Sequence, residues 1–287
     1  MLSQRATPRP PSRVPWWTIG LFLAPTLVFL LVFTYLPIGY ALLEGWPHLK
    51  EVLRSPDTLR AARITLLYTF VVVPSTVLLG LVSALLVEGT TRVKLFSRAV
   101  LFHPVILPMV AFASMWLYFL NPTSGPLTLG LSALLGRRVS PLTDVDLTLY
   151  TVAAVAVLKD FGLYMLFFLA GLQSIPRQLY EAALVDGAGA WVRFTRITLP
   201  LLGPTLFFVG VFATMTALRN VDHIWILTPQ GGVTGEAEVF LFHIYMVGFF
   251  YYNLPKASAL SILFFFLFTL IALISIPRIE KGIYYAD

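Results

Sequence analysis

Long uncharged stretches of apolar residues constrain this chain more than any other feature. Residues 14–43 contain no charged side chain, and a second uncharged run extends from Ile64 to Val87. A helix that crosses the hydrocarbon core of a bilayer needs about 20 apolar residues. Only 12% of the residues are charged, whereas an average soluble domain has about 25%. The sequence therefore excludes a water-soluble globule and predicts an all-α membrane protein.

The apolar runs predict six membrane-spanning helices in one domain, residues 16–287. The expected spans are residues 16–36, 64–87, 99–120, 147–172, 202–221 and 257–277. The proline-rich residues 1–15 are expected to form a flexible cytoplasmic leader. Residues 239–254 are also apolar but too short to cross a bilayer. Their Phe and Tyr content favours a surface-lying or a re-entrant segment, and the sequence leaves that choice open.

The positions of Lys and Arg predict the orientation, because cytoplasmic loops carry an excess of both. More of them fall on one side of the six spans: Arg5, Arg9, Arg13, Arg92, Lys94, Arg98, Arg177, Arg193, Arg196, Arg278 and Lys281. The other side holds fewer: Lys50, Arg54, Arg60, Arg63, Arg137, Arg138 and Lys256. Both termini are therefore predicted to be cytoplasmic. The basic pI of 9.6 follows from topology and does not indicate nucleic-acid binding. The chain has no cysteine and four scattered histidines, so no metal site is expected.

The loop between the fourth and fifth predicted spans, residues 173–200, is too structured for a simple connector. Pro176 suits the start of a helix, and Gly187 and Gly189 suit its end. A second short helix, residues 191–198, is expected to lead into Leu199 and Pro200. By pattern alone, the first helix is also compatible with an amphipathic helix that lies at the lipid headgroups.

The same loop carries a family signature. Glu181-Ala182-Ala183, Gly187, Ile197 and Leu199-Pro200 match the pattern EAA-x(3)-G-x(9)-I-x-LP at every fixed position. This pattern is typical of permease subunits of binding-protein-dependent ABC importers. The flanking residues 170–176 and 186–188 resemble the carbohydrate branch of this family, which includes the permeases of maltose-type and glycerol-3-phosphate-type importers. The resemblance extends over about residues 56–278 and includes residues 65–68 and Asn121-Pro122.

The resemblance implies the fold of a type I ABC importer permease in the inner (plasma) membrane of a prokaryote. It also implies that the loop forms a coupling helix seated in a cytoplasmic ATPase subunit. The coupling residues would be Tyr180, Glu181, Ala182, Ala183, Asp186, Gly187, Ala188, Ile197, Leu199 and Pro200. The expected partners are a second, homologous permease, usually in a heterodimer, two ATPase subunits, an extracytoplasmic solute-binding protein and membrane lipid.

The chain itself is not expected to be an enzyme. No G-x-x-x-x-G-K-[ST] segment occurs in it, so it lacks the usual loop for ATP phosphates. The resemblance places ATP and Mg²⁺ in the partner ATPase and implies no cofactor in this chain.

Charged and polar residues within or beside the spans are candidates for the solute path, because charges inside a bilayer are costly. Lys159 and Asp160 lie within the fourth span, and Tyr164 follows one turn later. Adjacent residues on a helix do not face each other, so these two charges do not form a simple internal ion pair. The alternative is that both serve assembly with the partner permease.

Two further groups extend the candidate solute path. The end of the fifth span offers Arg219, Asn220, Asp222 and Trp225, and the end of the third offers Trp116, Tyr118 and Asn121. Asn220 and Asp222 would bind sugar hydroxyls while Trp225 stacks on a pyranose face. The structural alternatives are an interfacial Arg219–Asp222 pair and a belt of aromatic residues at the membrane interface. The segment 227–232 follows the family pattern but lacks the usual proline after its glycines.

The sequence thus predicts a permease for a sugar or oligosaccharide, and leaves other solutes open. Arg219 would suit glycerol-3-phosphate or another small polar anion. A gradient-driven transporter would show paired broken spans in repeated halves, and no such repeat is evident. A membrane enzyme would need convergent catalytic groups at one depth, whereas the four histidines fall at unrelated depths.

Overall fold

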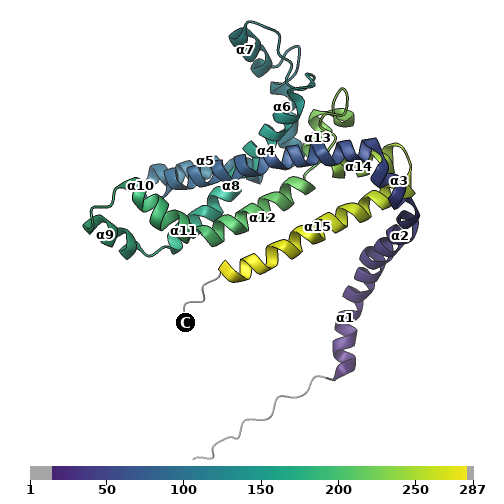
Figure 1. Cartoon of the computed structure of the whole chain (residues 1–287), viewed down its shortest axis with the longest axis horizontal. Coiled ribbons are helices and arrows are strands. Elements are labelled where there is room, and N and C mark those ends of the chain that lie inside the picture. The colour runs from purple at the N-terminus through teal and green to yellow at the C-terminus, as the bar shows by residue number, and fades with distance from the viewer. Residues whose placement is uncertain (1–14, 283–287) are drawn as a thin grey trace, which may run out of the picture.

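The computed structural model describes residues 15–282, and all regular elements in that range are helices (Figure 1). The all-α prediction is thereby confirmed. Of the predicted leader, only Pro15 lies within the described residues. The elements are α1 (Trp16–Leu30), η1 (Leu31–Tyr35), α2 (Leu36–Gly45), η2 (Trp46–His48), α3 (Leu49–Arg54), α4 (Pro56–Val87), α5 (Arg92–Ile106), α6 (Met109–Phe119), α7 (Pro126–Leu135), α8 (Thr148–Ser174), α9 (Arg177–Val185), α10 (Ala190–Arg193), η3 (Phe194–Thr198), α11 (Leu199–Leu201), α12 (Gly203–Arg219), α13 (Asp222–Leu227), η4 (Pro229–Gly231), α14 (Phe240–Tyr245), η5 (Met246–Phe250) and α15 (Leu254–Gly282).

The first helices form an arm that leaves the bundle (Figure 1). α1 has no buried residue, although it is apolar throughout. The π-helical turn η1 lies just before Pro37, whose missing N–H interrupts the regular hydrogen-bond ladder. The arm meets the bundle at Gly45, where an added Cβ would lie 2.6 Å from the backbone N of Ala259 in α15. Most apolar side chains of α1 and α2 are exposed among the described residues, although α2 also packs against α15.

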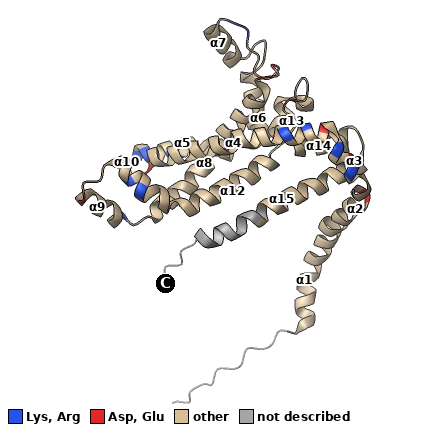
Figure 2. Cartoon of the chain, viewed as in Figure 1, with Lys and Arg blue, Asp and Glu red and all other residues tan. Residues whose placement is uncertain are grey.

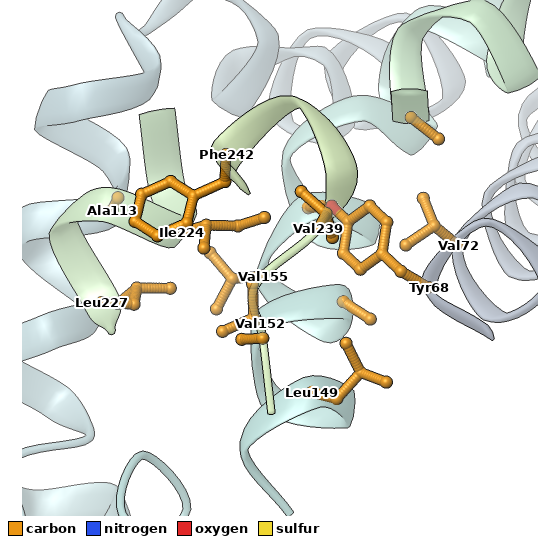
Figure 3. Close-up of a cluster of buried hydrophobic side chains, with 14 of the residues drawn as sticks. Tyr68, Val72, Ala113, Leu149, Val152, Val155, Ile224, Leu227, Val239 and Phe242 are labelled. Carbon is orange, nitrogen blue, oxygen red and sulfur yellow. The ribbon is translucent and has the colours of Figure 1, made fainter. Parts of the chain in front are cut away.

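α4 and α8 pack against each other along the centre of the bundle. Their backbones approach closely at Gly80, where an added Cβ would lie 2.9 Å from the Cβ of Tyr164. Buried apolar residues form one cluster around Tyr68, Val152 and Ile224, shown in Figure 3, and a second around Phe168. Helix α12 packs on α4, α15 packs on α12 and α2, and α5 packs on α8.

Two of the expected spans differ from straight helices. The third is divided into α5 and α6, whose axes bend by 97°. Leu107 at the break is extended, with φ −68° and ψ 141°, because the ring of Pro108 disfavours the helical conformation of the residue before it. The fifth follows a 64° bend between residues 190–201 and 203–219. Hydropathy alone had indicated a continuous helix over residues 99–120.

Four helical stretches are long and apolar enough to cross a membrane, and the number rises to six if each bent pair is counted as one span. They are Trp16–Arg54, Pro56–Val87, Thr148–Ser174 and Leu254–Ile271, with Arg92–Phe119 and Ala190–Arg219 as the bent pairs. The apolar segment that follows residue 239 forms the short α14 and η5, which pack on α4 and α15 respectively.

Charged residues gather toward the two ends of the bundle (Figure 2). Lys and Arg residues lie around α10 and the start of α5, and residues of both signs occur around α3, α13 and α14 (Figure 2). The helices between these ends are nearly free of charge.

Candidate coupling surface and solute pocket

The helix α9 ends in a hydrogen-bonded turn that the sequence requires. Gly187 has φ +75°, a left-handed conformation that residues with a Cβ rarely adopt. The N–H of Ala188 donates to the carbonyl of Ala183 at 2.8 Å, and the N–H of Gly187 donates to that of Leu184 at 3.1 Å. These two bonds define a Schellman motif, in which glycine allows the chain to reverse after the helix. The glycine of the EAA pattern thus has a backbone role that the structure shows directly.

The loop lies at one end of the bundle (Figure 1), and several of its apolar side chains are exposed. Val185 is 89% exposed and Trp191 is 74% exposed, and Leu184 is exposed beside them. Glu181 is also exposed, and no ion pair involves it among the described residues. An exposed apolar patch with a free carboxylate on an ordered helix is typical of a docking surface.

A hydrogen bond and apolar packing join α9 to the bundle. The hydroxyls of Tyr180 in α9 and Thr198 in η3 lie 2.9 Å apart and share a hydrogen bond. Ile175 and Leu202, which flank the loop, are buried in the second apolar cluster, and Tyr180 packs against it. Displacement of α9 would therefore pull on η3 and the start of α12.

The remaining predicted coupling residues lie on both sides of this contact. Ala182 and Asp186 are exposed, Ala183 and Ala188 are half-buried at the turn, and Ile197 is half-buried in η3. Leu199 and Pro200 open α11 and are exposed. The structure thus brings together the two ends of the signature.

Basic residues close the neighbouring turn between α4 and α5. Arg98 donates to the carbonyl of Val87 through Nε at 3.1 Å and to that of Gly89 at 2.7 Å. Lys94 donates to the carbonyl of Glu88. Cations at the end of a helix stabilise its unpaired carbonyls. Arg98 and Lys94 therefore stabilise the end of α4 by hydrogen bonds within this chain.

A second candidate site forms where the helical path breaks after α12. Asn220 leaves the helix with ψ 107°. Its side-chain amide donates to the Asp160 carboxylate of α8 at 3.4 Å. Both side chains are half-buried. Asp160 and Asn220, separated by 60 residues in sequence, are thus brought together by the fold as a half-buried polar pair.

An aromatic pocket of about 220 Å³ adjoins this break. It is lined by Val110 of α6, by Val221, Asp222, Trp225 and Ile226 at α13, and by Phe242 and Tyr245 of α14. The ring centroids of Trp225 and Tyr245 are 5.2 Å apart, and Trp225 is 41% exposed. A mostly apolar pocket with one carboxylate and exposed ring faces suits a small ligand that carries hydroxyl groups.

Lys159 has a different environment from its neighbour Asp160. It is only 6% exposed, and its Nζ donates to the backbone carbonyl of Val105 at 3.0 Å. Val105 lies in the last turn of α5, just before the break, where carbonyls lack helical partners. One turn along α8, Gly162 permits close contact, because an added Cβ would lie 2.3 Å from the carbonyl oxygen of Leu101. Lys159 therefore caps the broken helix.

The other predicted solute residues are dispersed. Tyr164 is buried in the second apolar cluster, and Trp116 packs against the first. Tyr118 is exposed. The side chain of Asn121 accepts from the N–H groups of Thr123 and Ser124 and so orders a turn.

Arg219 ends α12 and is exposed. Among the described residues its guanidinium takes part in no ion pair, so the Arg219–Asp222 pair considered from the sequence is not formed. Those residues also contain no group of three or more His, Asp or Glu side chains that could hold a metal ion.

No local pattern in the sequence predicts the ordered loop that follows α13, residues 228–239. The Glu236 carboxylate accepts from the N–H groups of Val233 at 3.0 Å and Thr234 at 2.8 Å. Burial acts to raise the pKa of the Glu236 carboxyl, but the hydrogen bonds from these N–H groups and from the Thr234 hydroxyl together lower it by more. The net pKa therefore lies below its ordinary value of 4.5. Arg60 of α4 donates to the carbonyl of Thr234. These contacts join positions up to 174 residues apart, which no local pattern signals.

Taken together, the fold and these two sites define a class: a polytopic helical membrane subunit with an exposed coupling-type loop at one end and a pocket beside a broken span. The chain matches the family described as "Binding-protein-dependent transport system inner membrane component" over residues 76–283. It belongs to this family and is a permease subunit of an ABC importer in the inner membrane. The resemblance seen in the EAA pattern is confirmed.

Known proteins similar to this chain support the assignment. The sn-glycerol-3-phosphate transport system permease protein UgpA of Agrobacterium fabrum is 28% identical over 280 residues, which cover 92% of this chain and 95% of that protein. A chain in a crystal structure of a bacterial ABC transporter involved in the import of the acidic polysaccharide alginate has a TM-score of 0.80 and 26% identity. The match covers 92% of this chain and 96% of that chain. A bacterial alginate ABC transporter in complex with an alginate pentasaccharide-bound periplasmic protein gives a TM-score of 0.77 and 27% identity over 90% of this chain and 92% of that chain.

Proposed function

We propose that this permease forms half of the solute path of an importer for a sugar or oligosaccharide, and that α9 couples it to a cytoplasmic ATPase. The observation that carries the proposal is the exposed α9 itself, with its Schellman turn at Gly187 and a carboxylate at Glu181 that is free of ion pairs among the described residues. Tyr180 and Thr198 provide the mechanical link from this surface to the helices that lead to the pocket.

ATP hydrolysis is assigned to the partner subunit. The sequence contains no P-loop motif, so ATP and Mg²⁺ would bind to the ATPase and not to this chain. Small residues on α9 allow the helix to seat deeply in a cleft, and Glu181 supplies one oriented charge. Closure of two ATPases around ATP would then push two such helices together and switch the permease pair between inward-facing and outward-facing states.

A second, homologous permease is needed to complete the path. Asp160 and Asn220 are only half-buried, and polar groups at membrane depth are costly unless protein or water covers them. The apolar arm α1 lacks a buried residue, which supports packing against another membrane subunit. Carbohydrate-type relatives usually pair as heterodimers, and this arrangement is proposed here.

The α9 end is proposed to face the cytoplasm, together with both termini. Arg92, Arg177, Arg193 and Arg196 lie at this end, as expected from the excess of basic residues in cytoplasmic loops. The pocket lined by Trp225 would then lie toward the outer half of the membrane, where an extracytoplasmic solute-binding protein delivers its cargo. Such a periplasmic protein accompanies the similar alginate transporter.

A neutral sugar is the main candidate solute, because Trp225 and Tyr245 offer ring faces and Asp222 offers a hydrogen-bond acceptor. Glycerol-3-phosphate is the second candidate. The exposed Arg219 has no ion pair among the described residues and lies three positions before Asp222, and a guanidinium suits a phosphate group. The permeases named UgpA transport that solute class by name.

The test is solute-stimulated ATP hydrolysis by the assembled importer in proteoliposomes. Glu181→Ala should abolish the stimulation while the complex still inserts, and Asp222→Ala should raise the solute concentration that gives half-maximal stimulation. Glu88→Ala removes another exposed carboxylate at the α9 end and is the matched control. Normal coupling in Glu181→Ala would refute the role of α9, and an unchanged response to solute in Asp222→Ala would refute the pocket.

A further inference from the structure

Tyr68 of α4 and His223 of α13 meet inside the core, 155 residues apart in sequence. The Tyr68 hydroxyl and the imidazole Nε2 of His223 lie 2.8 Å apart and share a hydrogen bond. Both side chains are buried, at 1% and 0% exposure. Neither was a candidate from the sequence, since an isolated tyrosine and an isolated histidine carry no recognisable pattern.

This bond is the imidazole's one polar contact within residues 15–282. The other ring nitrogen, Nδ1, is buried without a hydrogen-bond partner. A buried polar group that loses its partner is destabilised by its full desolvation cost. The ring of His223 is therefore held in one orientation, the one that keeps Nε2 on the Tyr68 hydroxyl.

Helix α13 forms one wall of the solute pocket, and His223 lies on its buried face. Ile224 and Leu227 are buried on the same helix and lie toward Val152 and Val155 of α8 (Figure 3). Their neighbours Asp222 and Trp225 are exposed and line the pocket.

The position of α13 depends on such tertiary contacts. It has only six residues, and a helix so short has little stability of its own. It also begins two residues after the extended Asn220, and the intervening Val221 is not helical, so α12 does not fix its rotation. Apolar contacts are non-directional, whereas a hydrogen bond has a preferred geometry. The Tyr68–His223 bond is a directional contact of this kind between α13 and α4.

We infer that Tyr68 and His223 are positioning residues for solute recognition: their hydrogen bond sets the rotation of α13 and so aims Asp222 and Trp225 into the pocket. The inference rests on the proposed function in one respect, that this pocket receives the solute. The geometry of α13 itself can be tested without transport.

The first experiment uses the assembled importer and the solute dependence of its ATPase activity. Tyr68→Phe and His223→Leu should each raise the half-saturating solute concentration about tenfold and leave the maximal rate unchanged. The double variant should be no worse than either single variant, because the same bond is lost once. His223→Gln, which keeps a polar group near the position of Nε2, should recover part of the loss.

The matched control is Thr76→Val. Thr76 is a buried hydroxyl on the same helix α4, but it bonds within the helix to the Val72 carbonyl and does not reach α13. Thr76→Val should leave the half-saturating concentration unchanged. If Tyr68→Phe only lowers the thermal stability, as Thr76→Val does, with no change in solute dependence or in the labelling described next, the positioning role is refuted.

The second experiment separates this inference from the proposed function. Since the chain has no cysteine, Trp225→Cys introduces a single thiol whose labelling rate in the assembled complex reports the orientation of α13. Adding Tyr68→Phe should change that rate about tenfold, and adding Thr76→Val should not. A changed rate, together with an unchanged solute response in Asp222→Ala, would refute the proposed pocket but retain the positioning role. An unchanged rate would overturn the positioning role whatever the transport result.

Discussion

Replacing Gly187 with alanine tests the coupling turn with the least disturbance to the rest of the chain. Gly187 has φ +75°, and nothing lies within 4 Å of the Cβ that alanine would add. The substitution therefore creates no clash inside the permease, and its whole cost is conformational. A residue with a Cβ in the left-handed region is disfavoured by about 1–2 kcal/mol, which lowers the population of the ordered turn about 5- to 30-fold relative to its open forms.

Two measurements report the effect of Gly187→Ala on the turn. Hydrogen exchange at the Ala188 amide, which donates to Ala183 in the turn, should accelerate by the same factor. Solute-stimulated ATP hydrolysis in proteoliposomes should fall, because α9 must be ordered to transmit movement of the ATPase. Gly187→Asn should restore part of the exchange protection, since asparagine tolerates this conformation.

Gly189→Ala is the control for this prediction. Gly189 lies two residues away and also has open space around its Cβ, but its φ of −66° and ψ of 166° suit any residue. It should leave both exchange and coupling unchanged. Equal effects of the two substitutions, or normal exchange in Gly187→Ala, would refute the argument that backbone conformation at this position supports coupling.

Three further predictions concern other parts of the molecule. Gly162→Ala should lower the stability of the purified complex by about 1–3 kcal/mol, because the added Cβ meets the Leu101 carbonyl at 2.3 Å. The control is Gly210→Ala, which has open space around its Cβ and should not lower the thermal midpoint. Similar midpoints for the two variants would contradict the packing argument. The lowered pKa of Glu236 means that its contribution to loop order is present above pH 4.5 and is lost as pH falls through the folded pKa below that value. The protection of the Thr234 amide, taken as its exchange rate relative to the intrinsic rate at each pH, should therefore fall at acid pH, and Glu236→Gln should remove this pH dependence. Trp225→Ala should raise the half-saturating solute concentration about fivefold, as expected for loss of ~1 kcal/mol of ring stacking. Trp191→Ala, at the opposite end of the bundle, should leave that concentration unchanged. The same half-saturating concentration in both variants would contradict the assignment of the pocket as the solute site.

The regions that sequence reasoning predicts well are those where local composition decides the structure. The apolar run at residues 64–87 falls within the single helix α4, and that at 147–172 coincides closely with α8. The helix over residues 177–185 and its glycine end follow from Pro176 and Gly187 acting on their immediate neighbours. These features depend on few residues at a time, so a pattern can represent them.

The remaining features depend on contacts between distant residues or on backbone geometry. Hydropathy measures side chains, so it did not reveal the bend at Leu107, which the backbone of a pre-proline residue imposes. Lys159 could be recognised as a costly charge, but its acceptor is a carbonyl 54 positions away. The Tyr68–His223 bond is still more remote in sequence.

The placement of Tyr164 and Trp116 in apolar clusters was equally hidden. Spacing along a helix does not state which face meets a neighbouring helix. Polar and aromatic residues in a span can therefore be identified as candidates from the sequence, while the fold decides which of them share a pocket.

The central claim is that this permease works in an assembly and is coupled to an ATPase through α9. The most direct test is affinity purification from the native membrane in mild detergent, with mass spectrometry of all co-eluting proteins, for the unmodified chain and for Gly187→Trp. The account predicts a second permease and a P-loop ATPase with the unmodified chain. It also predicts loss of the ATPase alone with Gly187→Trp, because a Cβ is disfavoured at φ +75° in the turn and the bulky ring would obstruct a partner. A folded, stable chain that elutes alone, or full retention of the ATPase by Gly187→Trp, would contradict it.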